Sequence, residues 1–429
     1  MRRRHVRDTS PAPLSARRAA RPAGPSPGRR AAAGRKKADV VAATGVPPAG
    51  TEDPAGRREP HAGPRDHSSG RPGTSLDGNP AALYHGDDMT LFPEVDGAPA
   101  SPLRLGDCAV YTGTCSWADP SFVQSDFYPE AVRARPRARL QYYASVFPTV
   151  EVDATYHALQ PAERAVQWVE TVPEPFLFNI KAFAWLTWHE SDPARLPREI
   201  FVLLPRPLQV EKRLAPSRLP EEIVTSVWDY FAAFIDALRL RERLGYVLFQ
   251  FPKGLGYTPE LFTYLDAWEL YLQNWPVAIE VRHREWYQGK ARAMLLGYLR
   301  EHGFAHVIAD MAPVRYLPEP LVEVTADWSV VRFHGRNPAL AEKGVSTQQA
   351  YDYLYTPEEL RPWAETAERL AADVRRLYLM FNNHARGQSA RNARELQLLL
   401  QERAAGARPR SEVGEPTQPG LTPSLGDPA

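Results

Sequence analysis

The chain has 429 residues, 43% of them hydrophobic and 10% aromatic, so it is long enough for a large core and one to three domains. Its 52 basic and 51 acidic residues nearly cancel, but residues 1–50 hold 12 Lys/Arg and only 2 Asp/Glu. The remaining 40 basic and 49 acidic residues give the rest of the chain a net charge of −9. This balance argues against a nucleic-acid-binding surface on the body of the protein.

Cysteine usage and hydropathy exclude several other classes of protein. Cys108 and Cys115 are the only cysteines, which is too few for a disulfide framework or a cysteine-based zinc site. We therefore expect a reducing, cytoplasmic environment. The N-terminal stretch MRRRHVRDTS lacks the apolar core of a secretory signal. No run of about 18 apolar residues occurs, so we expect neither a membrane span nor a membrane partner.

The two ends of the chain differ in composition from the middle. Residues 1–105 are rich in Pro, Ala, Gly and Arg and show no strand or helix period, which predicts a disordered basic extension. Alternative interpretations are a nucleic-acid-binding arm, or a translation start at Met89. Residues 405–429 predict a second disordered tail. The folded domain is thus expected over residues 106–404.

Short β-forming runs alternate with helical patterns through this domain. Eight strands are expected, at 109–117, 149–157, 176–185, 245–252, 277–283, 306–310, 330–336 and 376–384. Helices are expected around 140–147, 162–171, 223–238, 258–273, 290–302, 357–372 and 388–403. Strands that alternate with helices indicate a parallel sheet, and eight such units predict a (β/α)8 TIM barrel. A doubly wound open sheet is the main alternative.

The polar residues within the strands favour the barrel. Glu151 alternates with valines, Asn179 and Lys181 alternate with Phe178 and Ile180, and later strands repeat this pattern. In an open sheet covered by helices on both faces, such a polar face would be hard to hydrogen-bond. In a barrel, the same face is the lumen, and its C-terminal end is the mouth where barrel enzymes carry out chemistry. The long connections 190–219 and 337–356 follow strands and are expected at this mouth as lids or binding elements.

Eight short motifs occur in an order that resembles one protein family. They are GTCSW, FYP, TVEVDATYH, FNIKAF, VLFQFP, AIEVRHREW, VVRFHGRN and FNNHARGQSARNAREL, spread over about 109–400. Together they resemble the DUF72 (YecE-like) family, which implies a barrel with a shared polar mouth and supplies no reaction. The family has Ser-Gly before the tryptophan of the first motif, whereas this chain has Cys115-Ser116, and the N-terminal extension lies outside the family pattern.

Basic and amide side chains at the ends of strands predict an anion site. Barrels often bind phosphate near strands 7 and 8, and arginine suits phosphate or carboxylate. We therefore expect a small anionic substrate to be bound by Arg282, Arg332, Arg336, Asn382 and Asn383. The alternative is an internal ion-pair network, in which Arg282 and Arg332 neutralise Glu151, Glu280 and Asp310, and these acidic residues are themselves expected at the substrate.

Catalytic candidates follow from the same strand ends. Glu280 is a candidate base, and Lys181 is a candidate acid or nucleophile whose pKa we expect to be lowered if it is desolvated among arginines. The alternative for Lys181 is a salt bridge to Asp153 or Glu151. His283 and His334 are further acid–base candidates, although a lone histidine after a strand is more often structural.

The sequence gives weaker indications about metals, stacking aromatic residues and cofactors. Carboxylates and histidines at the mouth are suitable ligands for a divalent metal, but no ligand spacing sharpens this alternative, and no metal residues are assigned. Trp117 and Tyr156 are expected to stack on a sugar or a base, or simply to roof the barrel. No Gly-rich nucleotide-cofactor motif or serine-hydrolase motif is present.

The sequence thus favours an enzyme that performs acid–base chemistry, such as an isomerase, lyase or hydrolase, on a small phosphorylated or carboxylated, sugar-like molecule. Two alternatives stay open. One is a nucleic-acid-binding or processing protein that uses the basic extension and the rim aromatics. The other is a ligand sensor without catalysis.

Overall fold

The computed structural model describes residues 92, 98–341 and 345–406. The predicted extension therefore lies outside the described residues except for Phe92 and 98–105, as does most of the predicted C-terminal tail. Within the described part, no helix is long and apolar enough to cross a membrane.

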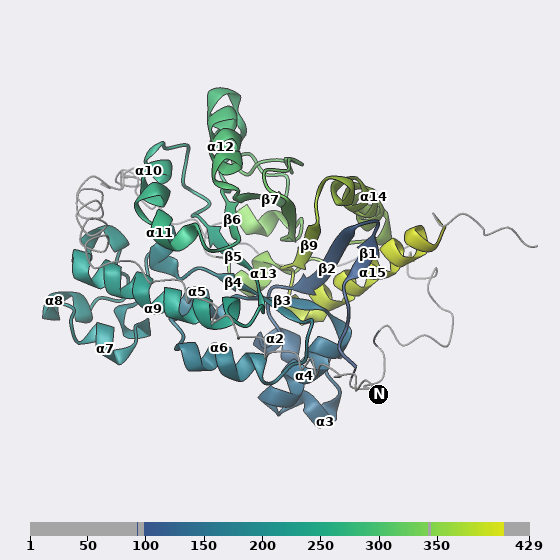
Figure 1. Ribbon diagram of the computed structural model, residues 1–429, viewed down its shortest axis with the longest axis horizontal. Helices are drawn as coiled ribbons and strands as arrows, with labels where there is room; N and C mark the ends of the chain where they lie inside the picture. Colours follow the sequence, from purple (N-terminus) through teal and green to yellow (C-terminus); the bar gives the residue numbers. More distant parts are fainter. Residues whose placement is uncertain (1–91, 93–97, 342–344, 407–429) are drawn as a thin grey trace, which may run out of the picture.

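Eight parallel strands of the described chain close into a barrel, which confirms the predicted TIM-barrel fold. The strands are β2 (Cys108–Thr114), β3 (Thr149–Val152), β4 (Leu177–Lys181), β5 (Leu244–Gln250), β6 (Val277–Glu280), β7 (Ala305–Asp310), β8 (Trp328–Phe333) and β9 (Arg376–Phe381). Each pairs with the next, and β2 pairs with β9 from Ala109↔Arg376 to Thr114↔Phe381, which closes the ring. Figure 1 shows the strands at the centre with helices arranged around them.

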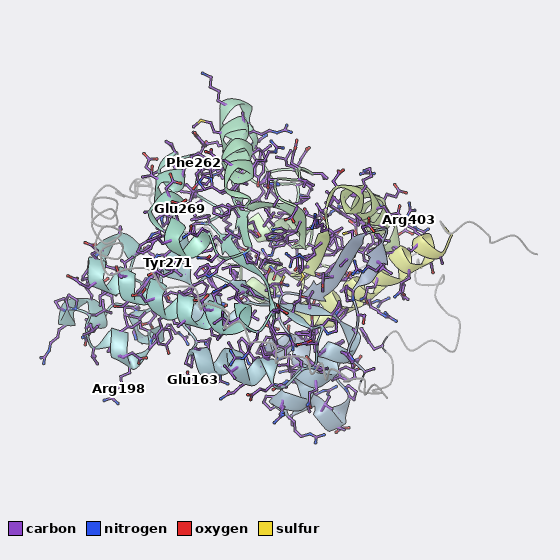
Figure 2. All side chains as sticks on the ribbon, in the orientation of Figure 1. Glu163, Arg198, Phe262, Glu269, Tyr271 and Arg403 are labelled. Atoms are coloured by element: carbon purple, nitrogen blue, oxygen red, sulfur yellow. The ribbon has the colours of Figure 1, made fainter. Side chains whose placement is uncertain are left out.

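The helices of the outer layer vary in length. They are α2 (Pro120–Val123), α3 (Glu130–Arg133), α4 (Pro136–Val146), α5 (Ala154–His157), α6 (Ala162–Val169), α7 (Arg198–Phe201), α8 (Arg206–Gln209), α9 (Glu221–Arg239), α10 (Glu260–Ala267), α11 (Glu269–Leu272), α12 (Gly289–His302), α13 (Thr347–Ala350), α14 (Pro357–Asp373) and α15 (Gln388–Gly406). Their charged side chains, such as Glu163, Arg198 and Arg403, lie on the outside of the molecule (Figure 2).

Strand alternation divides the interior into two cores. The outward residues of the strands pack against the helices in one continuous apolar cluster, to which α9 contributes an entire buried stripe. The inward residues of the lower lumen form a separate apolar layer, which includes Tyr246, Leu248, Val330, Tyr378 and Met380. Each fully buried side chain of this size stabilises the fold by about 1.5–3 kcal/mol.

Going up the same inward faces, the apolar layer gives way to a polar one. Leu248 is followed two residues later by Gln250, and Val330 by Arg332. Because side chains on a strand alternate with a period of two, these residues share the lumen face. The polar layer therefore lies just below the mouth, as the alternation predicted.

Three details differ from the expected elements. A short strand, β1 (Leu103–Leu105), pairs antiparallel with the start of β2, where no strand was expected. The expected helix 258–273 is broken at Trp268, whose indole stacks on Trp228 with ring centroids 4.6 Å apart. The connection 190–219 is structured by α7, α8 and a bridge between Ser191 and Leu214. Such tertiary contacts leave no periodic signal in the sequence.

At Gly113, strand β2 lies very close to the backbone of strand β3. A methyl group at this position would collide with the carbonyl oxygen of Thr149 on the neighbouring strand β3. We expect Gly113→Ala to lower the free energy of unfolding by about 1–3 kcal/mol or more, as overpacking does. Urea denaturation measures this loss.

The matched control is Gly297→Ala, in the middle of α12, where an added methyl group meets nothing within 4 Å. That substitution should stabilise the protein by up to about 1 kcal/mol, because alanine favours a helix over glycine. Equal effects of the two substitutions would contradict the close approach of β2 and β3.

Candidate functional site

A cavity of about 410 Å³ opens at the C-terminal ends of the strands, and we call it the mouth pocket. Residues at or just beyond the ends of β3, β4, β5, β6 and β9 line it, together with part of the connection after β8. The lining residues are Asp153, Tyr156, His157, Lys181, His189, Gln250, Pro252, Lys253, Gly254, Arg282, Ala339, Val345, Ala350, Tyr351, Asn382 and His384. The pocket thus lies where barrel enzymes hold their substrates.

Cations outnumber carboxylates in the mouth pocket. Among the described residues, Lys181, Lys253 and Arg282 line it, and Asp153 is the one carboxylate that does. Burial and then the nearby Arg282 lower the pKa of Lys253. Burial, followed by Arg282 and Lys181, lowers the pKa of His189 to about 3. Burial is the main cause in both residues, and the smaller contribution of Arg282 reflects the concentration of cations around the pocket.

Lys181 is held by an ion pair. Its Nζ lies 2.6 Å from Oδ1 of Asp153 and 4.4 Å from the ring centroid of Tyr156. Burial alone would lower the pKa of Lys181, but the Asp153 carboxylate raises it. The net shift is upward, opposite to the direction expected from the sequence. Lys181 is therefore a protonated amine at neutral pH, suited to donating hydrogen bonds or a proton and not to nucleophilic attack.

Arg332 lies fully buried below the pocket and ties two carboxylates together. Its Nε and Nη2 donate to the two oxygens of Glu151 at 3.1 and 2.6 Å. Its Nη1 donates to Glu280 and, at 3.0 Å, to Oε1 of Gln250. Tyr246 adds a hydrogen bond to Glu151 at 2.8 Å. This arrangement corresponds to the internal ion-pair alternative, because the guanidinium is already engaged and does not line the pocket.

His334 connects this cluster to the pocket. Its Nδ1 lies 3.0 Å from the side-chain amide nitrogen of Asn382, and its Nε2 lies 3.3 Å from Nη1 of Arg332. Nε2 lies 3.2 Å from Oε1 of Glu280, within ion-pair distance but outside hydrogen-bond geometry. Burial lowers the pKa of His334 to about 4, so the ring is neutral at pH 7.

Glu280 and Arg282 belong to one strand end but differ in access to the pocket. Nε of Arg282 lies 3.6 Å from Oε1 of Glu280. Arg282 lines the mouth pocket, whereas Glu280 is completely buried and does not. Burial would raise the pKa of Glu280, but Arg332 and His334 bring it well below its usual range. Glu280 is therefore an ionised group behind the pocket wall.

Arg336 and Asp310 pair with each other outside the pocket. Nε of Arg336 donates to both oxygens of Asp310 at 3.2 and 3.1 Å, and its Nη1 donates to Glu359 at 3.2 Å. Burial raises the pKa of Asp310, an effect that Arg336 partly offsets. Neither residue lines the mouth pocket.

The remaining expected residues fall in different places. Tyr156 and Asn382 line the mouth pocket. Asn383 is buried and donates to the carbonyl of Tyr353 at 2.8 Å, a structural contact. His283 lies 3.7 Å from Glu285, outside the lining of the pocket. Trp117 lines a second cavity of about 550 Å³ beside α4 and α6, which we call the flank pocket.

Several lining residues were not assigned to the site from the sequence. Asp153 follows the alternation of Glu151, so its side of the strand was predictable, but it was considered only as a partner of Lys181. Lys253 and His189 lie beyond the ends of their strands, where alternation no longer applies. Tyr351 comes from the long connection 337–356, which was expected at the mouth without specific residues.

His384 also lines the pocket and has an acidic neighbour. Its Nε2 lies 3.8 Å from Oδ2 of Asp119, and its ring lies nearly parallel to that of Tyr351 with centroids 5.8 Å apart. Asp119 caps the first turn of α2 through its other oxygen, which fixes the carboxylate. This pair places a titratable ring against the cavity.

The unusual Cys115-Ser116 pair has structural partners. The Sγ of Cys115 lies 3.7 Å from Nη2 of Arg332, and burial, followed by Glu151, raises the pKa of the thiol well above its usual value. The hydroxyl of Ser116 accepts hydrogen bonds from the backbone N–H groups of Ala118 and Asp119. The buried, protonated thiol is thus unsuited to nucleophilic chemistry.

The candidate metal ligands do not gather into one cluster in the described part of the chain. No group of three or more His, Cys, Asp or Glu side chains within residues 98–341 and 345–406 is arranged to hold a metal ion. Two of the carboxylates considered as ligands, Glu151 and Glu280, instead bind Arg332.

Comparisons with known proteins agree with the motif order seen in the sequence. The family described as "Protein of unknown function DUF72" matches residues 111–417. The chain is 26% identical over 307 residues to the UPF0759 protein YunF of Bacillus subtilis, covering 70% of this chain and 98% of that protein.

Solved structures of DUF72 family proteins are also similar. One from Thermotoga maritima is 27% identical with a TM-score of 0.53, and the match covers 68% of this chain and 99% of that chain. One from Enterococcus faecalis is 26% identical with a TM-score of 0.53, covering 68% of this chain and 95% of that chain. These names assign no reaction.

The buried cluster generates a prediction about stability. Replacing Arg332 with Met would leave Glu151 and Glu280 buried without their cation, so we expect a loss of about 3–5 kcal/mol at pH 7. Arg332→Lys keeps one charge and should lose less. As a control, Arg300→Met removes an exposed arginine 3.0 Å from Glu323 and should change stability by no more than about 1 kcal/mol.

The same variant has a distinctive pH dependence. In the native protein, the lowered pKa of Glu280 gives stability that is present above about pH 4.3 and is lost as pH falls through the folded-state pKa. Without Arg332, burial raises that pKa, so acidification from pH 7 to 5 relieves part of the penalty. Urea denaturation at both pH values should show a smaller deficit at pH 5. A deficit that does not depend on pH would refute this account.

Proposed function

The chain belongs to the DUF72 family, and we propose that it binds a small anionic, sugar-like molecule in the mouth pocket and carries out acid–base chemistry on it. The observation that carries this proposal is the charge of the pocket. Lys181, Lys253 and Arg282 face a cavity to which, within the described part of the chain, Asp153 alone contributes a carboxylate. The size of the pocket, about 410 Å³, suits a metabolite.

Arg282 is the main candidate for the anion. Its planar guanidinium presents paired donors that match phosphate or carboxylate. Its Nε is buried, has no hydrogen bond in the described residues, and lies 3.6 Å from Glu280. The Glu280 carboxylate thus holds Arg282 from below, while the side chain of Arg282 lines the mouth pocket and would be met there by an incoming anion.

Amide and aromatic groups complete a surface suited to a polyol. Gln250 and Asn382 present amide groups to the pocket, and Tyr156 and Tyr351 present rings. Sugars bind through hydroxyls that both donate and accept hydrogen bonds, and the faces of their rings stack on aromatic side chains. Of the sequence-derived residues, we retain Arg282, Asn382, Tyr156 and Lys181 for direct contact.

We assign one residue of the pocket as the proton donor and another as the base. Lys181 is a proton or hydrogen-bond donor, because the Asp153 carboxylate keeps it charged. His384, beside Asp119, is the candidate base that reaches the cavity. Glu280 and His334 act from behind the wall, because both are fully buried. Their proposed role is to position Arg282 and Asn382.

The test is a binding measurement on purified protein. Ribose 5-phosphate, glucose 6-phosphate and gluconate are titrated by calorimetry, and at least one is expected to bind. Arg282→Met should weaken that binding by about 10-fold to 100-fold, since a hydrogen bond to a charged group contributes about 1.5–3 kcal/mol. Arg284→Met is the matched control.

Arg284 is exposed, donates to the carbonyl of Arg315 and does not line the mouth pocket, so its loss should leave affinity unchanged. Binding that is insensitive to Arg282→Met would contradict the proposed anion site. Binding of none of the three compounds, together with tight, salt-sensitive binding of oligonucleotides, would favour the nucleic-acid alternative.

A further inference from the structure

The flank pocket lies beside the mouth pocket and has a different composition. It is a cavity of about 550 Å³ lined by residues of the loop after β2, the start of α4, the end of β3 and α6. Two indoles, Trp117 and Trp168, and three arginines, Arg137, Arg139 and Arg164, are among its lining residues. Asp153 is among the lining residues of both pockets, so the two cavities are neighbours at this residue.

The indoles form a fixed corner. Trp117 and Trp168 pack edge to face, with centroids 5.3 Å apart and an interplanar angle of 88°. Trp168 is itself held in place by stacking on Phe178 of β4 at 5.9 Å. Two rings at right angles offer one planar surface and one edge, which is the geometry that a planar ligand ring prefers.

The arginines of this pocket are available for a ligand. Within the described residues, none of Arg137, Arg139 and Arg164 forms an ion pair with a carboxylate. Arg139 donates through Nη1 to the carbonyl of Arg133 at 2.5 Å, but its buried Nε has no partner. Guanidinium groups stack on aromatic rings and donate to ring acceptors, so they suit a nitrogen heterocycle.

We propose that the ligand is nucleotide-like, with its planar base in the flank pocket, its ribose at Asp153 and its phosphate in the mouth pocket. A carboxylate accepts hydrogen bonds from ribose hydroxyls, as it does in dinucleotide-binding proteins. This inference rests on the proposed function, because it places the anionic part of the ligand at Arg282. It adds the chemical class of the rest of the ligand, a ribose that carries a planar base.

The test compares ligands with and without a base. Ribose 5-phosphate and the four common ribonucleoside 5′-monophosphates are titrated by calorimetry into the full-length protein. At least one mononucleotide should bind about 10-fold to 100-fold more tightly than ribose 5-phosphate, the range expected for one stacked base. Trp117→Leu and the double variant Arg137→Gln/Arg164→Gln should each remove most of this gain while leaving ribose 5-phosphate binding unchanged.

The variants separate the two proposals. Arg137 and Arg164 are exposed, so the double variant should fold even if Trp117→Leu does not, and Arg361→Gln on α14 is the control for removing an exposed helical arginine. Equal affinity for ribose 5-phosphate and all four mononucleotides overturns the nucleotide inference and leaves the mouth proposal standing. A gain that survives both flank variants has the same consequence. Binding of neither ribose 5-phosphate nor any mononucleotide overturns the nucleotide inference, and the mouth proposal falls as well if glucose 6-phosphate and gluconate also fail to bind.

Discussion

The bridge that Arg332 makes between Glu151 and Glu280 is the constraint on which the upper half of the barrel depends. The three residues lie on β8, β3 and β6, and all are fully buried. Isolated charges at this depth would be prohibitive, so each is acceptable only because the others are in place. The bridge therefore fixes the relative positions of three strands across the lumen.

The position of this bridge explains the character of the mouth. Below it, the lumen is filled by apolar side chains such as Leu248 and Val330. At its upper side, one guanidinium faces two carboxylates, and Arg282 at the rim lies 3.6 Å from Glu280 and so supplies the second positive charge. The cations Lys181, Lys253, Arg282 and Arg332 outnumber the carboxylates Asp153, Glu151 and Glu280 by one among the described residues of the pocket and the cluster below it, in a body whose net charge is negative.

The sequence revealed the fold and the facing of side chains, because both follow from local rules. The period of two in β3, β4, β6 and β8 placed Glu151, Lys181, Glu280 and Arg332 in the lumen. Which charge pairs with which depends on barrel closure, since Arg332 and Glu151 are 181 positions apart. The sequence also does not show how deep in the lumen a side chain lies. Arg332 and Arg282 both come from strand ends, yet Arg332 lies below the mouth pocket and Arg282 lines it. The lining residues beyond strand ends, such as Lys253, were missed because loop geometry sets their direction.

The connection between β7 and β8, residues 311–327, contains no helix, so this sector of the barrel has no helical cover of its own. Met311 and Leu317 instead form a small apolar cluster with Ala350, to which Val345 and Tyr351 add contacts. Those last three residues also line the mouth pocket. A ligand that contacts Tyr351 would therefore stabilise the apolar cluster that covers β7. Residues 311–327 do not line the mouth pocket, yet their amide hydrogen exchange would slow when the pocket is occupied.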